Sequence, residues 1–316
     1  MTTYVLRRVL QMIPVLLLVS IISFALIFML PGDPALLMLG DQMASNREVY
    51  EAFRRELGLD RPVYVQYLDW LQKTVRGDLG TSTRDKLPVA QGIAERFPVT
   101  LELTILAMVF ALCISMPAGI LSAVRPNSKL DVAGTLFAIW GVAIPHFWLG
   151  ILLIYALAVM AKLLPASGFV PFFDDPGRNF TLMLMPALTL GLHIAALQMR
   201  QVRSSLMEVL QQEYIITARS KGLAERAVIL GHAMKNALIP VVTVIGLQIG
   251  LLFGGAVITE SIFSVPGLGR WAVDSILWRD FPVVQAVCLV MATAVLFTNL
   301  AADILYAFID PRIRYK

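Results

Sequence analysis

The chain has 316 residues, of which 58% are hydrophobic and only 15% are charged. A soluble domain carries about 25% charged residues, so this composition excludes an ordinary soluble enzyme. The formal net charge is +4, from 26 basic and 22 acidic residues. Because the basic residues flank long apolar stretches and form no dense tract, the charge indicates membrane topology, and we expect no nucleic-acid partner.

Six apolar stretches account for this composition. None of them contains Asp, Glu, Lys or Arg, and each exceeds the roughly 18 residues that mark a candidate membrane-spanning helix. For segments of this length, only a helix satisfies every backbone amide in hydrocarbon. We therefore predict an all-α integral membrane protein in contact with lipid, with six transmembrane helices, the first of which is retained. The stretches cover residues 9–30, 103–124, 132–161, 179–199, 236–259 and 281–302.

Basic residues are distributed unequally between the short segments that join these stretches. One side, which includes both chain ends, holds thirteen Lys and Arg residues, and the short segments of the other side hold four. Short cytoplasmic segments are enriched in Lys and Arg. We predict that both ends are cytoplasmic (N-in, C-in). This divides the chain into a tail with the first span (1–30), an outer insertion (31–98) and a core with spans 2–6 (99–316).

The outer insertion is too long for a simple connection. Turn signals alternate in it with helix-like stretches, and within 46–57 the apolar residues Val49, Phe53 and Leu57 recur every four positions. This spacing is typical of one face of a helix. We predict that the insertion folds as a helical cap over the outer mouth of the protein.

Glycines mark one face of the fifth apolar stretch. Gly246, Gly250 and Gly254 are spaced by four residues. In a helix this spacing places all three on one side, where the absence of side chains lets another backbone come close. We predict a close helix contact on this face.

The cytoplasmic loop 200–238 carries the most informative sequence. It is too long for a turn and has a net charge of +3. Helix-forming residues around Ala218 are followed by Gly222 and then by a second helix-forming run to Lys235. This order predicts two short helices that meet at a glycine corner, because glycine adopts a positive φ without strain. Such a corner projects from the membrane surface, where it suits the docking of a partner subunit.

Five further motifs accompany this loop, and together they cover nearly the whole chain. The chain resembles the permease subunits of binding-protein-dependent ABC importers, in particular the dipeptide, oligopeptide and nickel class. The motifs that carry the resemblance are Leu30-Pro31-Gly32-Asp33-Pro34, Glu56-Leu57-Gly58-Leu59-Asp60, Gly77-Asp78-Leu79-Gly80, Phe263-Ser264-Val265-Pro266-Gly267-Leu268-Gly269 and Asp310-Pro311-Arg312-Ile313-Arg314.

The family's cytoplasmic signature, Glu-Ala-Ala followed by three residues and Gly, matches this loop only in part. Anchored on Gly222, the last Ala of the signature falls on Ala218, whereas Ile216 and Thr217 occupy its first two positions. The acidic position is therefore absent, and Glu213 lies three residues earlier. Peptide-class permeases commonly show this variant. The departure therefore weakens the inference that this loop forms the salt bridge typical of the signature, but it does not weaken the resemblance to the family.

The resemblance implies an assembly. The fold would be that of a type I importer permease with a helical insertion between spans 1 and 2, in a bacterial inner membrane. A second permease subunit would complete the pathway, two ATPase subunits would bind ATP and Mg, and a periplasmic or lipid-anchored binding protein would deliver the substrate. This chain would then bind no cofactor or metal and would not itself be an enzyme. The implied ATPase-coupling residues are Glu213, Ala218, Arg219, Lys221 and Gly222.

The resemblance also gives the outer cap a role. We expect the cap to touch the binding protein through Arg54, Arg55 and Glu56 at its rim, because mixed charge suits a reversible, wet contact. The alternative is a cap that packs only on the second permease subunit.

Polar residues inside the spans are candidates for the translocation pathway, because placing them against lipid is costly. We name His193, Gln198, Gln248 and Asn299 as this set. The alternative for each is a hydrogen bond between helices with no contact to substrate.

Other functions and substrates stay open at this point. The substrate expected from the resemblance is a dipeptide or oligopeptide, and nickel chelates, glutathione and opines are alternatives. A proton-coupled secondary transporter would need acidic residues within the spans, which these charge-free stretches lack. An intramembrane protease would need a nucleophile and a base, for which Ser115 and His193 are a conceivable pair. No phosphate-binding loop or zinc motif accompanies them.

Overall fold

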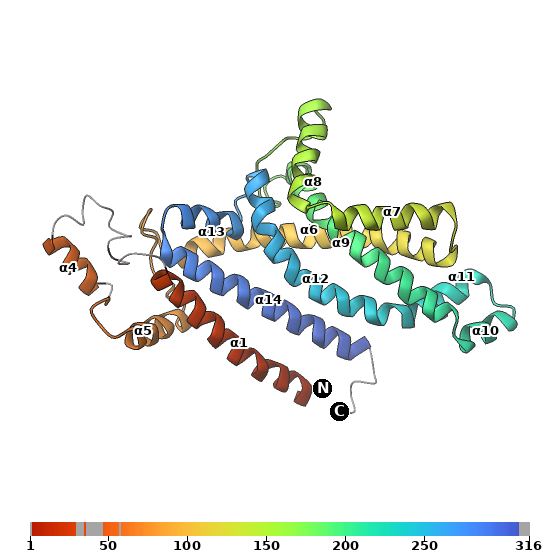
Figure 1. Ribbon diagram of the computed structural model, residues 1–316, viewed down its shortest axis with the longest axis horizontal. Coiled ribbons are helices and arrows are strands. Elements are labelled where there is room, and N and C mark those ends of the chain that lie inside the picture. The colour runs from red at the N-terminus through yellow and green to blue at the C-terminus, as the bar shows by residue number, and fades with distance from the viewer. Residues whose placement is uncertain (1, 30–34, 36–46, 57, 310–316) are drawn as a thin grey trace. The chain divides into compact units, whose positions relative to one another are not determined.

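The computed structural model describes residues 2–29, 35, 47–56 and 58–309 (Figure 1). This part of the chain is almost entirely helical, and its one strand-type pairing is an isolated antiparallel bridge between Thr81 and Pro88. The predicted all-α class is confirmed. Leu57 and the motifs at 30–34 and 310–314 lie outside the described residues.

The helices follow one another with short connections, and two of them continue into π-helical turns. In chain order they are α1 (Thr2–Met29), α4 (Arg47–Glu56), α5 (Val63–Val75), α6 (Val89–Val124), α7 (Lys129–Ala143), α8 (His146–Leu153) with the π-helical turn η1 (Ile154–Met160), α9 (Pro176–Leu210), α10 (Glu213–Ser220), α11 (Glu225–Ala227) with the π-helical turn η2 (Val228–Ala233), α12 (Met234–Phe263), α13 (Leu268–Leu277) and α14 (Phe281–Ile309).

The apolar stretches of the sequence coincide with long helices. Within the described residues, five helical segments are long and apolar enough to cross a membrane. A bent helix pair supplies a sixth candidate span. The five segments are Leu6–Leu26, Val89–Val124, Pro176–Leu210, Glu225–Phe263 and Phe281–Ile304.

The third predicted span, 132–161, is not one continuous helix. It consists of Lys129–Ala143 and His146–Met160, which meet at an angle of 103°. Ile144 leaves helical geometry with ψ of 122°, as the residue before a proline favours, and Pro145 has no amide hydrogen to continue the helix. Three other prolines, Pro14, Pro186 and Pro240, remain inside unbroken helices. A proline alone therefore did not locate the break.

The chain forms two compact units, and α1, α6 and α14 contribute to both. The first consists of Met1–Val5, Thr100–Val265 and Val295–Lys316, and the second of Leu6–Val99 and Pro266–Ala294. These units are defined by packing and follow other boundaries than the segments 1–30, 31–98 and 99–316. The division into those three segments stays a prediction.

The core of the first unit is built around α9. Half of this helix is buried, including Met183, Met185 and Met199, and it packs against α7, α8 and α12. Small residues allow the close contacts: a Cβ on Gly191 would lie 2.6 Å from the carbonyl oxygen of Ala107, and one on Gly141 would lie 2.5 Å from the Cβ of Ala196. Substitution at either glycine would force the helices apart.

The glycine face of α12 is confirmed at two of its three positions. A Cβ on Gly246 would clash with Ala302 of α14, and one on Gly250 would lie 3.1 Å from Cγ1 of Val295. Outside its own helix turn, Gly254 has no atom of the described residues within 4 Å of the position its Cβ would take. The sequence thus predicted the close contact but extended it one helical turn too far.

The second unit combines an apolar core with buried hydrogen bonds. Its core contains Val89, Leu268, Val283, Ala286 and Val287. Beside it, the buried carboxylate of Asp280 accepts hydrogen bonds from the Ser82 hydroxyl at 2.5 Å and from the Thr83 amide at 3.1 Å. These bonds tie the segment before α6 to the start of α14.

Candidate functional site

The segment between α9 and α12 folds as a compact helical corner. We call residues 213–233 the corner segment: it comprises α10, the turn at Lys221 and Gly222, α11 and η2. In Figure 1 it lies at the ends of α9 and α12, away from α8. Glu213 stands in the first turn of α10, where a carboxylate interacts favourably with the helix dipole. The predicted glycine turn and the short helix before it are confirmed. The second helix is not short, because α11 and η2 continue without a break into α12 and form the helical segment Glu225–Phe263.

Gly222 has the conformation that the sequence predicted. Its φ is +76°, a value that residues with a side chain rarely adopt, and its amide donates to the carbonyl of Arg219 over 2.9 Å. Apart from its two chain neighbours, no atom in the part of the chain that the structure describes lies within 4 Å of the position that its Cβ would take. Backbone strain, and not a clash, is therefore what a substitution at Gly222 would introduce.

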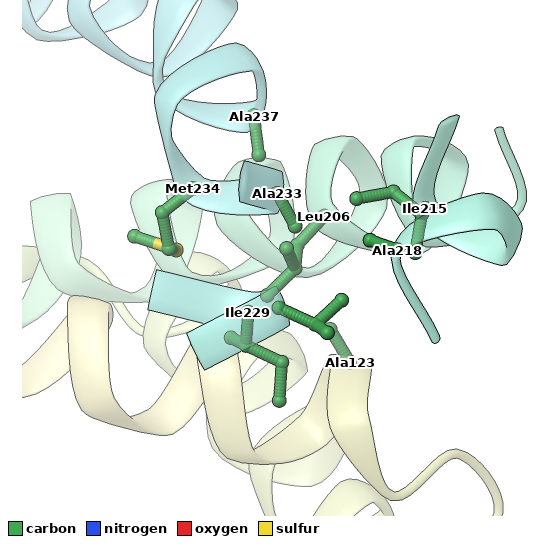
Figure 2. Close-up of a cluster of buried hydrophobic side chains, with 9 residues drawn as sticks. Ala123, Leu206, Ile215, Ala218, Ile229, Ala233, Met234 and Ala237 are labelled. Atoms are coloured by element: carbon green, nitrogen blue, oxygen red, sulfur yellow. The ribbon is translucent and has the colours of Figure 1, made fainter. Parts of the chain in front are cut away.

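An apolar cluster anchors the corner segment to the helices on either side. Figure 2 shows its side chains converging from α6, α9, α10, η2 and α12. Within the corner segment, α10 contributes Ile215, which is fully buried, and Ala218, which is 8% exposed, and η2 contributes three further residues. Burial of a side chain as large as isoleucine stabilises a fold by about 1.5–3 kcal/mol. The cluster consists of Ala123, Leu206, Ile215, Ala218, Val228, Ile229, Ala233, Met234 and Ala237.

Polar contacts close the corner on its exposed side. The guanidinium of Arg219 donates two hydrogen bonds to the carboxylate of Glu225, at 2.6 and 3.1 Å, across the glycine turn. This hydrogen bonding raises the pKa of Arg219 above its ordinary value. The Asn236 side-chain amide donates to the Tyr214 hydroxyl over 2.7 Å. Both pairs connect residues on opposite sides of Gly222.

The predicted coupling residues therefore differ in accessibility. Glu213, Lys221 and Gly222 are exposed, whereas Ala218 is buried. The resemblance placed Ala218 among the residues that couple to the ATPase subunit. The structure places it inside the cluster instead, where a larger side chain would collide with the segment's own neighbours. Its small size serves internal packing, and Arg219 is paired within its own segment.

Exposed apolar side chains on the corner segment were missed by the sequence reading. Tyr214, Ile216 and Leu223 are 41%, 55% and 42% exposed. The same segment carries the exposed charges of Lys221 and the Arg219–Glu225 pair. Apolar side chains surrounded by charged ones are typical of a protein contact surface. Ile216 stands at the acidic position of the family signature, and that departure was the available signal.

A second missed feature is the ion pair between Asp131 and Arg203. The guanidinium of Arg203 in α9 binds both carboxylate oxygens of Asp131, at 2.6 and 2.9 Å, and the Asp131 side chain is only 5% exposed. The same carboxylate accepts from the Asn127 amide, while Ser128 caps α7. Ser128 and Asp131 have capping-box spacing, which could have located this helix start. The pair fixes α9 just before the corner segment.

The four pathway candidates have different surroundings. Nδ1 of His193 lies 3.0 Å from the carbonyl oxygen of Gly141, and the His193 ring is 6.4 Å from that of His146. The amide nitrogen of Gln198, which is fully buried, donates to the carbonyl of Val241. Among the described residues, the side-chain oxygens of Gln198, Gln248 and Asn299 lack a hydrogen-bond partner. Their role in a pathway stays a prediction.

The three rim residues of the cap lie on α4. Arg54 is partly buried, contacts the ring of Tyr50 and is directed toward the carbonyl of Leu59, so only part of it is available to a partner. Arg55 is exposed, and the side chain of Glu56 lies outside the described residues. Val49 is 41% exposed, and the side chain of Phe53 is likewise not described. Contact with a binding protein stays a prediction.

The apolar helices and the folded segment between two of them define the chain as a multi-pass helical membrane protein. The chain belongs to the family of binding-protein-dependent transport system inner membrane components. The model of that family matches residues 115–315, and the model of its N-terminal region matches residues 1–104. The predicted family and the predicted location in the inner membrane are both confirmed.

Curated relatives match over the full length of both chains. The dipeptide transport system permease protein DppB of Escherichia coli K12 is 42% identical over 339 aligned residues, and the glutathione transport system permease protein GsiC of Escherichia coli O6:H1 is 44% identical over 316. Each alignment covers 100% of this chain and 100% of the relative. The substrates in these two names differ although the identities are almost equal.

A solved structure supports the fold. The inward-facing MetNI methionine ABC transporter has a chain that aligns with a TM-score of 0.58 at 19% identity, covering 69% of this chain and 96% of that chain. This likeness confirms the fold of an ABC importer permease for the present chain.

Proposed function

We propose that this chain is a non-catalytic permease subunit of an ATP-driven importer of dipeptides or other short peptides. The corner segment carries the proposal: it is a rigid, exposed element attached to α9 and α12, and it combines apolar and charged side chains in the manner of a protein interface. The names of the relatives DppB and GsiC support a peptide substrate, since glutathione is itself a short peptide.

In this proposal a second permease subunit completes the pathway and two ATPase subunits bind the corner segments. When the ATPase subunits close on ATP, they displace the corner segment. Because Ile215 and Ala218 are packed against α9 and α12, the displacement is passed to these two helices and not absorbed by a flexible loop. A binding protein delivers the peptide from outside. ATP and Mg belong to the partner subunits.

The partly unpaired amides of the spans give the pathway its proposed polar lining. Gln198 on α9, Gln248 on α12 and Asn299 on α14 each carry an oxygen that has no partner among the described residues. Such an oxygen accepts hydrogen bonds from the amides or ammonium group of a passing peptide. A buried acceptor left unpaired costs about 1–3 kcal/mol, so a polar permeant or a water molecule would relieve this cost.

Purification and reconstitution test this function. We expect the affinity-tagged chain to copurify with a second permease and with ATPase subunits, and the reconstituted assembly with its binding protein to accumulate labelled dipeptide only when ATP is supplied. Unlabelled glutathione and longer peptides, added as competitors, define the substrate range. Uptake that follows a proton gradient without ATP, by the chain alone, would establish a secondary transporter and contradict the proposal.

A further inference from the structure

An open cavity of about 460 Å³ lies within the second unit, between the cap and the ends of two spans. Phe24 and Phe28 of α1 and Trp70 of α5 line its apolar side, and their rings form one group: Phe24 lies 5.3 Å from Phe28 and 5.7 Å from Trp70 between ring centroids. The buried side-chain amide of Gln285 on α14 donates to the carbonyl of Phe24 and joins α14 to α1 at this cavity.

Some of the charged side chains that line this cavity have an ionic or hydrogen-bond partner, and others have no ionic partner. Asp69 forms an ion pair with Arg61 at 3.0 Å, and the carboxylate of Asp78 accepts from the Gly80 amide at the same distance. Arg55 and Lys73 also line the cavity, and neither forms an ion pair within the part of the chain that the structure describes. The carboxylate of Asp78 likewise has no ion pair among the described residues, and Nε of Arg55 donates to the carbonyl of Glu51. The lining groups without an ionic partner are therefore two cations and one carboxylate, and their net charge of +1 favours an anionic ligand.

The apolar side of the cavity continues along α1. Leu17 and Ile21 precede Phe24 and Phe28 at helical spacing and are 45% and 49% exposed, while Phe28 is 37% exposed. Residues Leu6–Leu26 of this helix form a candidate membrane span. The stripe therefore leads from the cavity into the hydrocarbon region, where it offers an apolar surface of the kind that an acyl chain covers.

The position of α5 agrees with a site at the membrane surface. None of its residues is buried, and Tyr64, Leu68 and Val75 form one exposed apolar face, with exposures of 69%, 58% and 79%. Its charged side chains, including Lys73, lie on another face. A helix with this pattern lies in the interface with its apolar face toward the acyl chains. Trp70 and Tyr67 are the aromatic side chains typical of this depth.

We propose that this cavity binds the phosphodiester headgroup of a membrane phospholipid, with Arg55 and Lys73 as ligands of the phosphate and the Leu17–Phe28 stripe of α1 as the contact for an acyl chain. The lipid would fill the space between the cap and the membrane and hold α5 at the surface. This proposal is independent of the transported substrate and of the direction of transport.

Native mass spectrometry of the purified, delipidated complex tests this site. Added phosphatidylglycerol or phosphatidylethanolamine should occupy one site more tightly than all others. Replacing both cations, Arg55→Gln with Lys73→Gln, should weaken this first site ten-fold or more, because each basic side chain near an anionic lipid headgroup contributes measurably to affinity. The matched control Arg47→Gln with Arg76→Gln removes two exposed cations that do not line the cavity and should leave the affinity unchanged.

Two further measurements serve as controls. The first asks whether free phosphate can replace the lipid, and the second asks whether substitution at these two positions damages the fold. Inorganic phosphate at concentrations equal to the lipid should not compete, because it lacks the acyl chains. The charge-preserving exchange Arg55→Lys with Lys73→Arg should keep the site within about two-fold of the original. The proposal would be overturned if the Arg55→Gln, Lys73→Gln variant and the Arg47→Gln, Arg76→Gln control bound the lipid with equal affinity. Full competition by inorganic phosphate, or the absence of a preferred first lipid in the original complex, would also overturn it.

Discussion

The corner segment and the cap look alike in sequence but are built differently. We use cap here for the described residues 47–56 and 58–88. Both regions are rich in charge, contain short helices and turn at glycines with positive φ, Gly222 in one and Gly58 and Gly77 in the other. Yet α10 buries Ile215 and Ala218 among its eight residues, whereas the thirteen residues of α5 include none that is buried.

If the proposed function is correct, this difference predicts that the corner segment, and not the cap, transmits motion to the spans. The corner segment is packed into a cluster shared by α9 and α12, so a displacement of its surface must move these helices. The cap instead surrounds a cavity with charged and aromatic side chains. A region of that kind suits a ligand or a reversible contact. We expect substitutions to separate the two regions by their effects on coupling.

The largest expected effect concerns topology and is all-or-none. Single cysteines introduced as Gln72→Cys in α5 and Ser204→Cys near the end of α9 are both exposed. In a background without Cys113 and Cys288, an impermeant thiol reagent should label only the first in intact cells and both after the cells are opened. Labelling of both in intact cells would contradict the prediction that the two regions lie on opposite sides of the membrane.

The next effect concerns packing. Ala218→Leu would insert a large side chain into the cluster of Figure 2 and should lower the free energy of unfolding by about 1–3 kcal/mol. The same change at an exposed helical position of the cap, Ala52→Leu, should alter stability by less than about 0.5 kcal/mol. Thermal unfolding of the purified complexes measures both. Equal stabilities would show that Ala218 is not confined as described.

A pair of glycine substitutions distinguishes the effect of backbone strain on stability from a role of the corner segment in coupling. Gly222 and Gly77 both have a positive φ, +76° and +86°, and neither has a described atom beyond its chain neighbours within 4 Å of the position its Cβ would take. Valine at either position should therefore cost a similar 1–2 kcal/mol of backbone strain. Gly222→Val should in addition lower peptide-stimulated ATP hydrolysis several-fold, whereas Gly77→Val should leave it near the original rate. If both variants lose coupling to the same degree, the corner has no special role.

The smallest effect is expected for the exposed ion pair. Arg219 and Glu225 are 41% and 51% exposed, so a double-mutant cycle with Arg219→Gln and Glu225→Gln should give a coupling energy of about 0.2–1 kcal/mol. This energy should fall as salt is raised. A larger, salt-independent value would mean that the pair is shielded from solvent, for which the present structure gives no basis.

The sequence predicted the apolar helices, the corner at Gly222 and the glycine contact of α12 because each has a local signature. Charge-free runs mark helices, a lone glycine between helix formers marks a turn, and spacing by four marks a helix face. The burial of Ala218 and the pairing of Asp131 with Arg203 have no local signature. They depend on which helices become neighbours, because the two members of the ion pair are 72 positions apart in the sequence.

The helix break at Pro145 is another feature that the local sequence alone does not predict. Pro14, Pro186 and Pro240 are tolerated within continuous helices, and Pro145 is not. A proline removes one backbone hydrogen bond at every such position, but only the packing around the helix decides whether the helix then bends or breaks. The cavity beneath the cap likewise assembles side chains from α1, α5 and α14, which are far apart in sequence.

Cross-linking from the corner segment tests the central claim most directly. A cysteine introduced as Lys221→Cys is exposed beside Gly222, and the complex would otherwise lack Cys113 and Cys288. With a short bifunctional reagent, it should form a covalent product with an ATPase subunit, and the yield should change when ATP is added. The equivalent cysteine at Arg76 in the cap should form no such product. Equal cross-linking from both positions, or none from Lys221→Cys in an active complex, would contradict the account.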